Sequence, residues 1–462
     1  MHRTLVLNVV GLTPDLIGEH TPHLARLADA GATRYIDTVT PAVTCSVQSS
    51  FVTGLPVSGH GVVANGWYFR DLSEVWFWRQ SNRLVAGEKL WETARRRDAA
   101  FTCAKLFWWY NMYSSADISV TPRPMYPADG RKLPDVYSQP AELRDELQTQ
   151  LGQFPLFKFW GPMANIEASR WITDAALEVH RRFAPTLNLV YLPHLDYNLQ
   201  RLGPSHPQIA DDVRAIDAEC GRLIEAAERD GLRVIVLSEY GITQVSDAVH
   251  VNRALREAGL LTVREELGRE LLDAGASRAF AVADHQVAHI YVANPADIVA
   301  VKRLVEGLDG VEVVLDEAGK SERGLDHPRS GELVAVSRAD RWFSYYYWLD
   351  DAKAPDFART VDIHRKPGYD PVELFIDPTL SLAKARIAGK LMARQLGFRV
   401  LLDVIGFDTK LVKGSHGRPT DRPQAGPVCI SSEPRITERM VPGENVSAPQ
   451  VRDLILAHVF DD

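Results

Sequence analysis

The sequence predicts an α/β fold in which a mostly parallel central sheet is flanked by helices. Short apolar, β-branched runs alternate along the chain with stretches of helical periodicity, which is typical of βα units. The 462 residues are 45% apolar and 24% charged, so the chain can bury one large core, or a core plus an inserted lobe. No repeat or low-complexity tract interrupts this pattern.

The strands and helices of the core are expected at the strongest of these patterns. Buried strands are predicted at Leu5–Val10, Phe101–Leu106, Leu187–Leu192 and Arg233–Leu237. Helices are predicted at His23–Ala30, Ile166–Phe183 and Ile209–Asp230. Later in the chain, a helix at Pro295–Leu308 and strands at Val311–Leu315 and Glu332–Ser337 are expected, and the polar, proline-rich stretch Pro122–Pro140 is a candidate lid.

Charge and cysteine content restrict the class of partner. The net charge is −8 with a pI near 6.0, and no long basic run is present, so a nucleic-acid polymer is not expected as a partner. The first apolar run, Leu5–Val10, is too short for a signal sequence or a membrane helix. Four widely spaced cysteines (Cys45, Cys103, Cys220 and Cys429) give no disulfide pattern. A cytoplasmic protein without a membrane partner is therefore expected.

A threonine lies where a strand is expected to turn into a helix, in the run from Pro41 to Gly54. A hydroxyl at a helix N-terminus can use nearby backbone N–H groups and the helix dipole to hold an anion, which suits attack on phosphorus. Thr44 is therefore a candidate nucleophile. The alternative is that Thr44 only caps the helix, as threonine commonly does.

Other polar residues follow the predicted strands. His194 and Asp196 come after the third strand, and Glu239 and Tyr240 come after the fourth. A further glycine-flanked polar turn, Lys413–Arg418, lies near the C-terminus. Ligand sites of open α/β sheets lie beyond the carboxyl ends of the strands, so these groups are expected to meet. Carboxylates, a histidine and a hydroxyl on separate loops are what metal-assisted phosphoryl transfer requires.

The order of these segments resembles the alkaline phosphatase superfamily, in its type I phosphodiesterase/nucleotide pyrophosphatase branch. The resemblance covers Leu5 to Gly241 and resumes at Gly414 to Val451. It is carried by Gly11-Leu12-Thr13-Pro14-Asp15, the Thr44 turn with Val52-Thr53-Gly54 and His60-Gly61, Tyr191 to Pro204, Ser238-Glu239-Tyr240-Gly241, and Gly414-Ser415-His416-Gly417. It implies an alkaline phosphatase-like core in two parts, 1–245 and 411–462, with cap and insertion segments at 246–410.

In this family two metal ions, usually zinc, flank the nucleophile. Thr44 matches the nucleophile, Asp196 and His416 match two ligands, and Glu239 replaces an aspartate. The remaining ligand positions are occupied by Val10, Gln200 and Tyr240, which are not typical zinc ligands. Two closely spaced zinc ions need several anionic or imidazole ligands, so the metal centre is expected to be atypical.

Several arrangements of the site stay open on these residues. One ion could be held by Asp196, Gln200 and His416, and manganese, magnesium or calcium would suit their oxygen donors better than zinc. Glu239 and Thr44 are candidate ligands beside the nucleophile, and further histidines (His194, His285, His327 and His364) could complete a second site or simply be hydrogen-bonded side chains. Without metal, Glu239 could act as a general base for Thr44, with Tyr240 donating to an oxyanion.

The predicted function is a hydrolase of a small phosphate or phosphonate ester that uses Thr44 with metal assistance. The alternatives are a phosphoryl transferase or other enzyme with an altered or absent metal site, and a non-catalytic ligand-binding protein. Aromatic clusters such as Phe107–Tyr110 are either core packing or a cleft for an aromatic or apolar part of the substrate. The sequence does not determine the oligomeric state.

Overall fold

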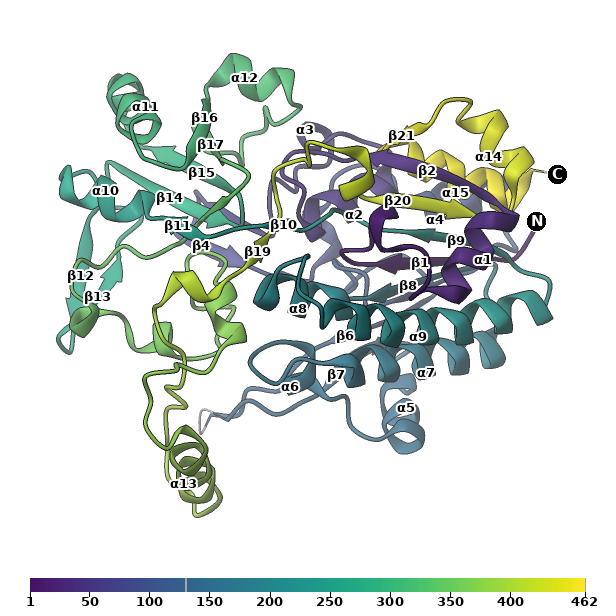
Figure 1. The fold of residues 1–462 in the computed structure, drawn as a ribbon, viewed down its shortest axis with the longest axis horizontal. Helices are drawn as coiled ribbons and strands as arrows, with labels where there is room; N and C mark the ends of the chain where they lie inside the picture. The colour runs from purple at the N-terminus through teal and green to yellow at the C-terminus, as the bar shows by residue number, and fades with distance from the viewer. Residues whose placement is uncertain (129–130, 462) are drawn as a thin grey trace.

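A nine-stranded, mostly parallel sheet forms the centre of the molecule, as the sequence predicts. The structure is a computed structural model that describes residues 1–128 and 131–461, with the side chains of residues 394 and 395 left aside (Figure 1). The strand order is β21-β2-β20-β9-β1-β8-β5-β6-β7. These strands are β1 (Thr4–Val9), β2 (Ala32–Asp37), β5 (Cys103–Leu106), β6 (Ile118–Pro122), β7 (Val136–Gln139), β8 (Leu187–Leu192), β9 (Arg233–Leu237), β20 (Val428–Ser431) and β21 (Asn445–Ser447).

The central strands β9, β1, β8, β5 and β6 run parallel, whereas β20 and β7 are antiparallel to their neighbours. β1 and β8 are buried at every position, because helices cover both faces of the sheet. One face carries α1 (Pro22–Ala30), α7 (Ile166–Phe183), α8 (His194–Leu202) and α9 (Ile209–Arg229), and the other carries α2 (Thr44–Thr53), α4 (Leu90–Arg97) and α15 (Gln450–Phe460) (Figure 1). Shorter helices α3 (Val57–His60), α5 (Leu143–Leu151), α6 (Leu156–Phe159) and α14 (Pro434–Met440) complete this region.

A second, antiparallel sheet lies beside the central one and has its own apolar core. Its order is β14-β15-β17-β16, and the strands are β14 (Ala279–Asp284), β15 (Val287–Val292), β16 (Val311–Leu315) and β17 (Leu333–Ser337). It packs with α10 (Val251–Glu257), α11 (Ile298–Glu306) and α12 (Glu317–Glu322). This sheet falls inside the predicted cap at 246–410, although the exact boundaries of the three predicted parts stay a prediction.

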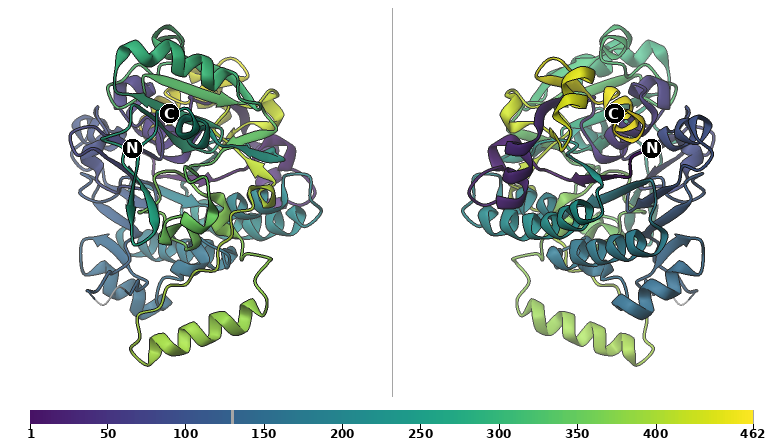
Figure 2. Two further views of the ribbon diagram at one scale, coloured as in Figure 1. Left: turned by 90° about the vertical axis from the view of Figure 1, so that its left-hand side faces the viewer. Right: turned by 90° about the vertical axis from the view of Figure 1, so that its right-hand side faces the viewer.

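Four small strand pairs and one projecting helix are found outside the two large sheets of the described chain. The pairs are β3 (Gly66–Phe69) with β4 (Glu74–Phe77), β10 (Thr243–Gln244) with β19 (Gly414–Ser415), β11 (Asp247–Val249) with β18 (Arg341–Phe343), and β12 (Val263–Glu266) with β13 (Arg269–Leu272). Helix α13 (Ala383–Gln395) stands away from the rest of the chain in all three views (Figures 1 and 2).

Most of the elements expected from periodicity are present, with small shifts at their ends. The strand expected at Phe101–Leu106 begins only at Cys103, and the helix expected at Pro295–Leu308 divides into a 3-10 turn and α11. The candidate lid at Pro122–Pro140 is partly wrong, because Val136–Gln139 forms β7 and pairs with β6. Residues 129–130 of that stretch lie outside the described residues.

The four cysteines are all buried and free in the part of the chain that the structure covers. None of the helices in this part is sufficiently long and apolar to span a membrane.

Candidate active site

Thr44 is the first residue of α2 and lies at the carboxyl edge of the central sheet. The cap position before it belongs to Val43, whose backbone is extended, so the Thr44 side chain is not an N-cap. The Thr44 hydroxyl instead shares a hydrogen bond of 3.2 Å with the Tyr240 hydroxyl. Thr44 is buried, and the alternative of a simple capping threonine is therefore wrong.

The closing segment of the chain reaches the same edge through a backbone bridge. Ala42 and Gly417 pair in antiparallel fashion just before α2. His416 is thereby brought beside Thr44, and its Nδ1 hydrogen-bonds to the Ala42 carbonyl oxygen at 2.8 Å. Because a carbonyl oxygen only accepts, Nδ1 carries the hydrogen and Nε2 presents its lone pair to the site.

Asp196, near the start of α8, faces this lone pair. Its Oδ1 lies 3.9 Å from His416 Nε2 and accepts a 3.4 Å hydrogen bond from the Tyr240 hydroxyl. Its Oδ2 accepts from Gln200 Nε2 at 2.8 Å. Burial raises the pKa of the Asp196 carboxyl to about 7, although the hydrogen bonds from Gln200 and Tyr240 oppose that rise. The structure therefore leaves a carboxyl that is only 13% exposed beside a histidine lone pair, with no cationic side chain bonded to either among the described residues.

Glu239, directly after β9, occupies a different environment on the other side of Tyr240. Its Oε1 accepts two hydrogen bonds of 2.6 Å, from Asn8 Nδ2 and Gln48 Nε2. Its Oε2 is buried and has no hydrogen-bond partner within the described part of the chain. Burial raises the pKa of the Glu239 carboxyl to about 8, against the opposing effect of Gln48 and Asn8. Two amide groups thus bind one oxygen of this carboxyl.

A continuous stack of rings runs from Tyr240 into the second sheet. The Tyr240 and His416 rings are 3.5 Å apart and nearly parallel, at 6°. His416 lies 3.7 Å from His285, and His285 lies 3.6 Å from Tyr369. Tyr369 in turn donates from its hydroxyl to Gln200 Oε1 at 3.0 Å. His285 is thus the one predicted additional histidine that the described contacts join to the site.

His285 sits in the turn between β14 and β15 and has a left-handed backbone, with φ of 59°. Its Nδ1 lies 2.7 Å from Asp284 Oδ1, and the Asp284 carboxylate also accepts from the backbone N–H of Asn65 at 2.7 Å. Asn65 Oδ1 accepts the backbone N–H of Cys45, the residue after Thr44. The Asp284–His285 turn is therefore tied to the start of α2 through Asn65.

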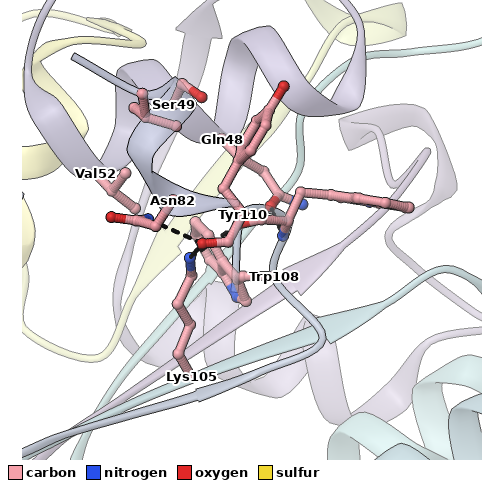
Figure 3. Close-up of a pocket in the computed structure, with 9 residues that line it drawn as sticks. Gln48, Ser49, Val52, Asn82, Lys105, Trp108 and Tyr110 are labelled. Atoms are coloured by element: carbon pink, nitrogen blue, oxygen red, sulfur yellow. Dashed lines mark hydrogen bonds between the residues drawn. The ribbon is translucent and has the colours of Figure 1, made fainter. Parts of the chain in front are cut away.

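A small cavity is lined by Gln48, Lys105 and Trp109 among other residues (Figure 3). It has space for about one water molecule. The Lys105 ammonium donates to the carbonyl oxygens of Trp109 and Tyr110, at 2.8 and 3.1 Å, and burial lowers the pKa of Lys105 to about 7. Trp109 donates its backbone N–H to Gln48 Oε1 at 2.8 Å. Lys105 therefore supports the loop that orients Gln48, and Gln48 orients Glu239.

The other three predicted histidines are used elsewhere. His194 Nε2 lies 3.2 Å from Asp212 Oδ1, a residue of α9. His327 accepts from the backbone N–H of Arg329, and His364 lies against the Phe77 carbonyl oxygen. No contact of the described residues joins any of these three to Thr44 or Asp196. Their assignment as metal ligands stays a prediction without support from the geometry.

The donor set can be compared with what two metal ions would require. On the Glu239 side, Val10 offers no ligand atom, the Tyr240 hydroxyl is hydrogen-bonded, and Glu239 Oε1 is held by two amides. No group of three or more His, Cys, Asp or Glu side chains in the described residues could hold a metal ion. A two-zinc centre therefore does not fit these residues.

One ion on the Asp196 side fits better. The Nε2 lone pair of His416 faces Asp196 Oδ1, an oxygen that otherwise accepts a long 3.4 Å hydrogen bond from Tyr240. The hydrogen bond of His416 to Ala42 orients the ring as metal-binding histidines usually are. Gln200 would be the third ligand, and its carboxamide would have to turn, because Nε2 now faces Asp196. The residues thus fit a single divalent cation.

Three groups that sequence reasoning missed complete the site: Asn8, Gln48 and Tyr369. Asn8 is a lone polar residue inside the apolar run of β1, which could have indicated a buried partner. Gln48 lies one turn after Thr44 in α2 and could have been placed on the same face. Tyr369 follows the second sheet and is more than a hundred residues from any other site residue except His285 and His416, so no local pattern points to it.

Comparison with known proteins agrees with this description of the fold. The family model for type I phosphodiesterase/nucleotide pyrophosphatase matches residues 4–370. No curated protein sequence matches the chain.

Several solved structures share the fold at low sequence identity. An inactive variant of murine ectonucleotide pyrophosphatase/phosphodiesterase 5 in complex with AMP is 15% identical, with a TM-score of 0.58 over 99% of this chain and 95% of that chain. Phosphonoacetate hydrolase from Sinorhizobium meliloti 1021 in complex with phosphonoacetate is 14% identical, with a TM-score of 0.60 over the same shares of the two chains.

Proposed function

Because the chain belongs to the type I phosphodiesterase/nucleotide pyrophosphatase family, we propose that it hydrolyses a small phosphate or phosphonate ester through Thr44. The observation that carries the proposal is the position of the Thr44 hydroxyl. It lies at the start of α2, is bonded to Tyr240, and Tyr240 is bonded in turn to Asp196. A hydroxyl at a helix N-terminus with a connected proton acceptor is the arrangement that a phosphoryl-transfer nucleophile needs.

The proposed first step is attack of Thr44 Oγ1 on phosphorus. A bond forms between that oxygen and phosphorus, and the bond from phosphorus to the leaving alcohol breaks. The Thr44 proton passes to the Tyr240 oxygen while Tyr240 gives its own proton to Asp196, and solvent protonates the leaving group. In the second step water attacks phosphorus and loses a proton to solvent, and the bond between phosphorus and Thr44 Oγ1 breaks. Thr44 Oγ1 recovers its hydrogen from Tyr240, which takes back the proton held by Asp196.

A divalent cation fits the Asp196 side of this site, where Asp196, Gln200 and His416 would hold it. When bound, it would supply positive charge for the phosphoryl oxygens. Zinc is implied by the family, whereas the oxygen donors of Asp196 and Gln200 favour manganese, magnesium or calcium. Neither Asp196 nor Glu239 is paired with a lysine or arginine in the described residues. The positive charge of the cation would therefore be what attracts an anionic substrate to these two carboxyls.

The substrate is proposed to be small and to carry an aromatic or apolar group. Similar folds bind AMP and phosphonoacetate, which are both small phosphorus compounds. In this chain, half-buried Trp78 lies 4.7 Å from the Trp109 ring and 6.2 Å from Tyr369, at the end of the ring stack. These rings, inclined to one another by 40° and 63°, offer an apolar lining near the reacting groups.

The test compares Thr44→Ala with Thr44→Ser on aryl phosphodiesters, aryl phosphates and aryl phosphonate esters, with each of the four metals added. Wild-type turnover, its loss in Thr44→Ala by about 1,000-fold or more, and partial retention in Thr44→Ser are expected. Mass spectrometry of the acid-quenched protein should show phosphate on Thr44.

Equal turnover in Thr44→Ala and the wild type would overturn the nucleophile assignment. The ligand-binding alternative would be favoured instead if a phosphorylated compound raises the melting temperature of the wild type and no product forms with any of the metals. Product that forms only when an acceptor alcohol replaces water would favour the phosphoryl transferase.

A further inference from the structure

Exposed apolar side chains are concentrated in the segment that contains α13. Nine of the nineteen large apolar side chains that are exposed among the described residues lie between residues 376 and 402, so this one segment differs from the rest of the surface. They are Ile376, Leu382, Leu391, Met392, Leu396, Phe398, Val400, Leu401 and Leu402. Leu382, Leu396 and Phe398 are 82%, 73% and 65% exposed. Surfaces of this kind usually mark an interaction site.

The segment is also basic, although the chain as a whole is acidic. Residues 376–402 contain five lysine or arginine residues and one aspartate, Asp377, which lies 3.9 Å from Arg359 outside the segment, whereas the net charge of the chain is −8. The basic residues are Lys384, Arg386, Lys390, Arg394 and Arg399. Asp403, just beyond the segment, pairs with Arg386 at 3.1 Å and with Lys390. A single carboxylate therefore offsets only part of this positive charge.

The segment stands apart from the body of the molecule. In Figures 1 and 2, α13 projects at one end of the molecule and is joined to the rest of the chain by two extended segments. Among the described side chains of α13, only the partly buried Ile387 packs against an apolar core cluster. Projection allows this helix to approach a negatively charged surface while the acidic body stays farther from it.

A second exposed apolar group lies at the same end. Met125 and Tyr126, in the connection between β6 and β7, are 42% and 53% exposed. The Arg399 guanidinium donates to the carbonyl oxygen of Ala128 at 3.3 Å, which places this connection beside the α13 segment. Tyrosine is common where protein meets the membrane interface, because its ring is apolar and its hydroxyl is polar.

We propose that residues 376–402 bind the surface of a membrane that contains anionic lipid, with the apolar side chains of α13 and its C-terminal extension entering the headgroup region. Basic residues beside exposed Leu, Met and Phe are the combination that interfacial helices use, with lipid phosphates as the counter-charge. A second copy of the chain fits less well, because it would bring two positively charged segments together. The sequence predicted no membrane partner because it has no run long enough to span a membrane, and a helix that lies on a membrane surface needs no such run.

The experiment is sedimentation of the full chain with vesicles of phosphatidylcholine alone and with about 30% phosphatidylglycerol, at low and high salt. Binding to the anionic vesicles that weakens with salt is expected. The variant Leu391→Glu/Met392→Glu should lose at least about 10-fold in partitioning, and Lys384→Glu/Arg386→Glu should lose a similar factor. Because no turnover is measured, the result does not depend on the proposed hydrolase activity.

A matched control is Leu267→Glu, which changes a fully exposed leucine in the turn between β12 and β13, and it should bind vesicles as the wild type does. Circular dichroism and melting of each variant establish that it is folded. Absence of wild-type binding to anionic vesicles, or equal loss in the control, would overturn the proposal. The proposal would also be overturned if the wild type does not bind vesicles but forms a dimer that Leu391→Glu/Met392→Glu converts to monomer. That result would assign the segment to a self-association interface.

Discussion

The two sides of Tyr240 present similar side chains in opposite chemical settings. On one side Asp196 faces the lone pair of His416 at 3.9 Å, and on the other Glu239 is bound by two amide groups at 2.6 Å. Glu239 is fully buried and Asp196 is mostly buried, and burial raises the pKa of each carboxyl. The difference is that amide hydrogens already bind one oxygen of Glu239, whereas Asp196 and His416 together still offer two positions to a cation.

On the ligand assignment proposed from the family resemblance, this contrast leaves one of the two ion positions without most of its ligands. Val10 and Tyr240 remove ligand positions only on the Glu239 side, and the Asn8 and Gln48 amides bind the carboxyl that remains. On the Asp196 side only Gln200 departs from the family pattern, and an amide still has an oxygen that can bind a hard cation. The two halves should therefore respond differently to metal, to substitution and to pH.

The largest expected difference is in metal affinity. Asp196→Asn should weaken manganese or zinc binding by about 100-fold or more, because it removes the only charged ligand on that side. Glu239→Gln keeps the shape of its side chain and should leave the affinity nearly unchanged. Titration calorimetry of both variants measures this. Equal loss in both variants would show that Glu239 is also a ligand.

Restoring ligands on the Glu239 side should change the number of ions. The double variant Val10→Asp/Tyr240→His supplies a carboxylate and an imidazole beside Glu239, so it should bind about two zinc ions per chain where the wild type binds about one. Elemental analysis after zinc loading and desalting gives the ratio. Two ions in the wild type would contradict the proposed division of the site.

The pH dependence of stability should follow the two raised carboxyl pKa values. Between the usual carboxyl pKa near 4 and the folded values of about 7 and 8, the folded chain binds more protons than the unfolded chain. Stability of the metal-free protein should therefore fall as pH rises from about 4 to about 8. Melting in a chelating buffer measures the slope.

The variants Asp196→Asn and Glu239→Gln should each make that slope shallower, since each removes one titrating group. Added metal should make the slope shallower by binding Asp196 and not Glu239. In the Asp196→Asn variant, added metal should therefore cause no further change in the slope. An unchanged slope in both variants would assign the pH dependence to other groups.

The smallest expected effect concerns the amide that holds Glu239. Gln48→Ala removes one of the two donors to Glu239 and leaves the Trp109 N–H without its acceptor, which should cost about 1–3 kcal/mol of unfolding free energy. Lys105→Met should act in the same direction by releasing the loop at Trp109. Denaturant unfolding measures both. Ser49→Ala, one residue from Gln48, serves as the comparison.

Much of the fold could be predicted because its signals are local. The helix at Ile166–Phe183 and the strand at Leu187–Leu192 agree with their expected bounds, since apolar periodicity over several turns or a continuous buried run determines each. β7 was missed because four residues with mixed burial after a proline-rich stretch carry no comparable pattern.

Within the site, the sequence by itself determined which groups follow the strands of a parallel sheet: Thr44, Asp196, Glu239 and Tyr240. Parallel strands end at one edge, so residues just after them must converge whatever the rest of the chain does. The sequence also determined that the ligand types on the Glu239 side depart from a two-zinc set.

Only the tertiary structure decided what each of these groups touches. That Asn8 and Gln48 bind Glu239, that His285 and Tyr369 stack beside His416, and that the other three histidines pair elsewhere depends on contacts between residues far apart in the chain. A side chain's partners, and hence its charge and its availability to a cation, follow from packing distances of a few ångströms. Spacing along the sequence does not encode those distances.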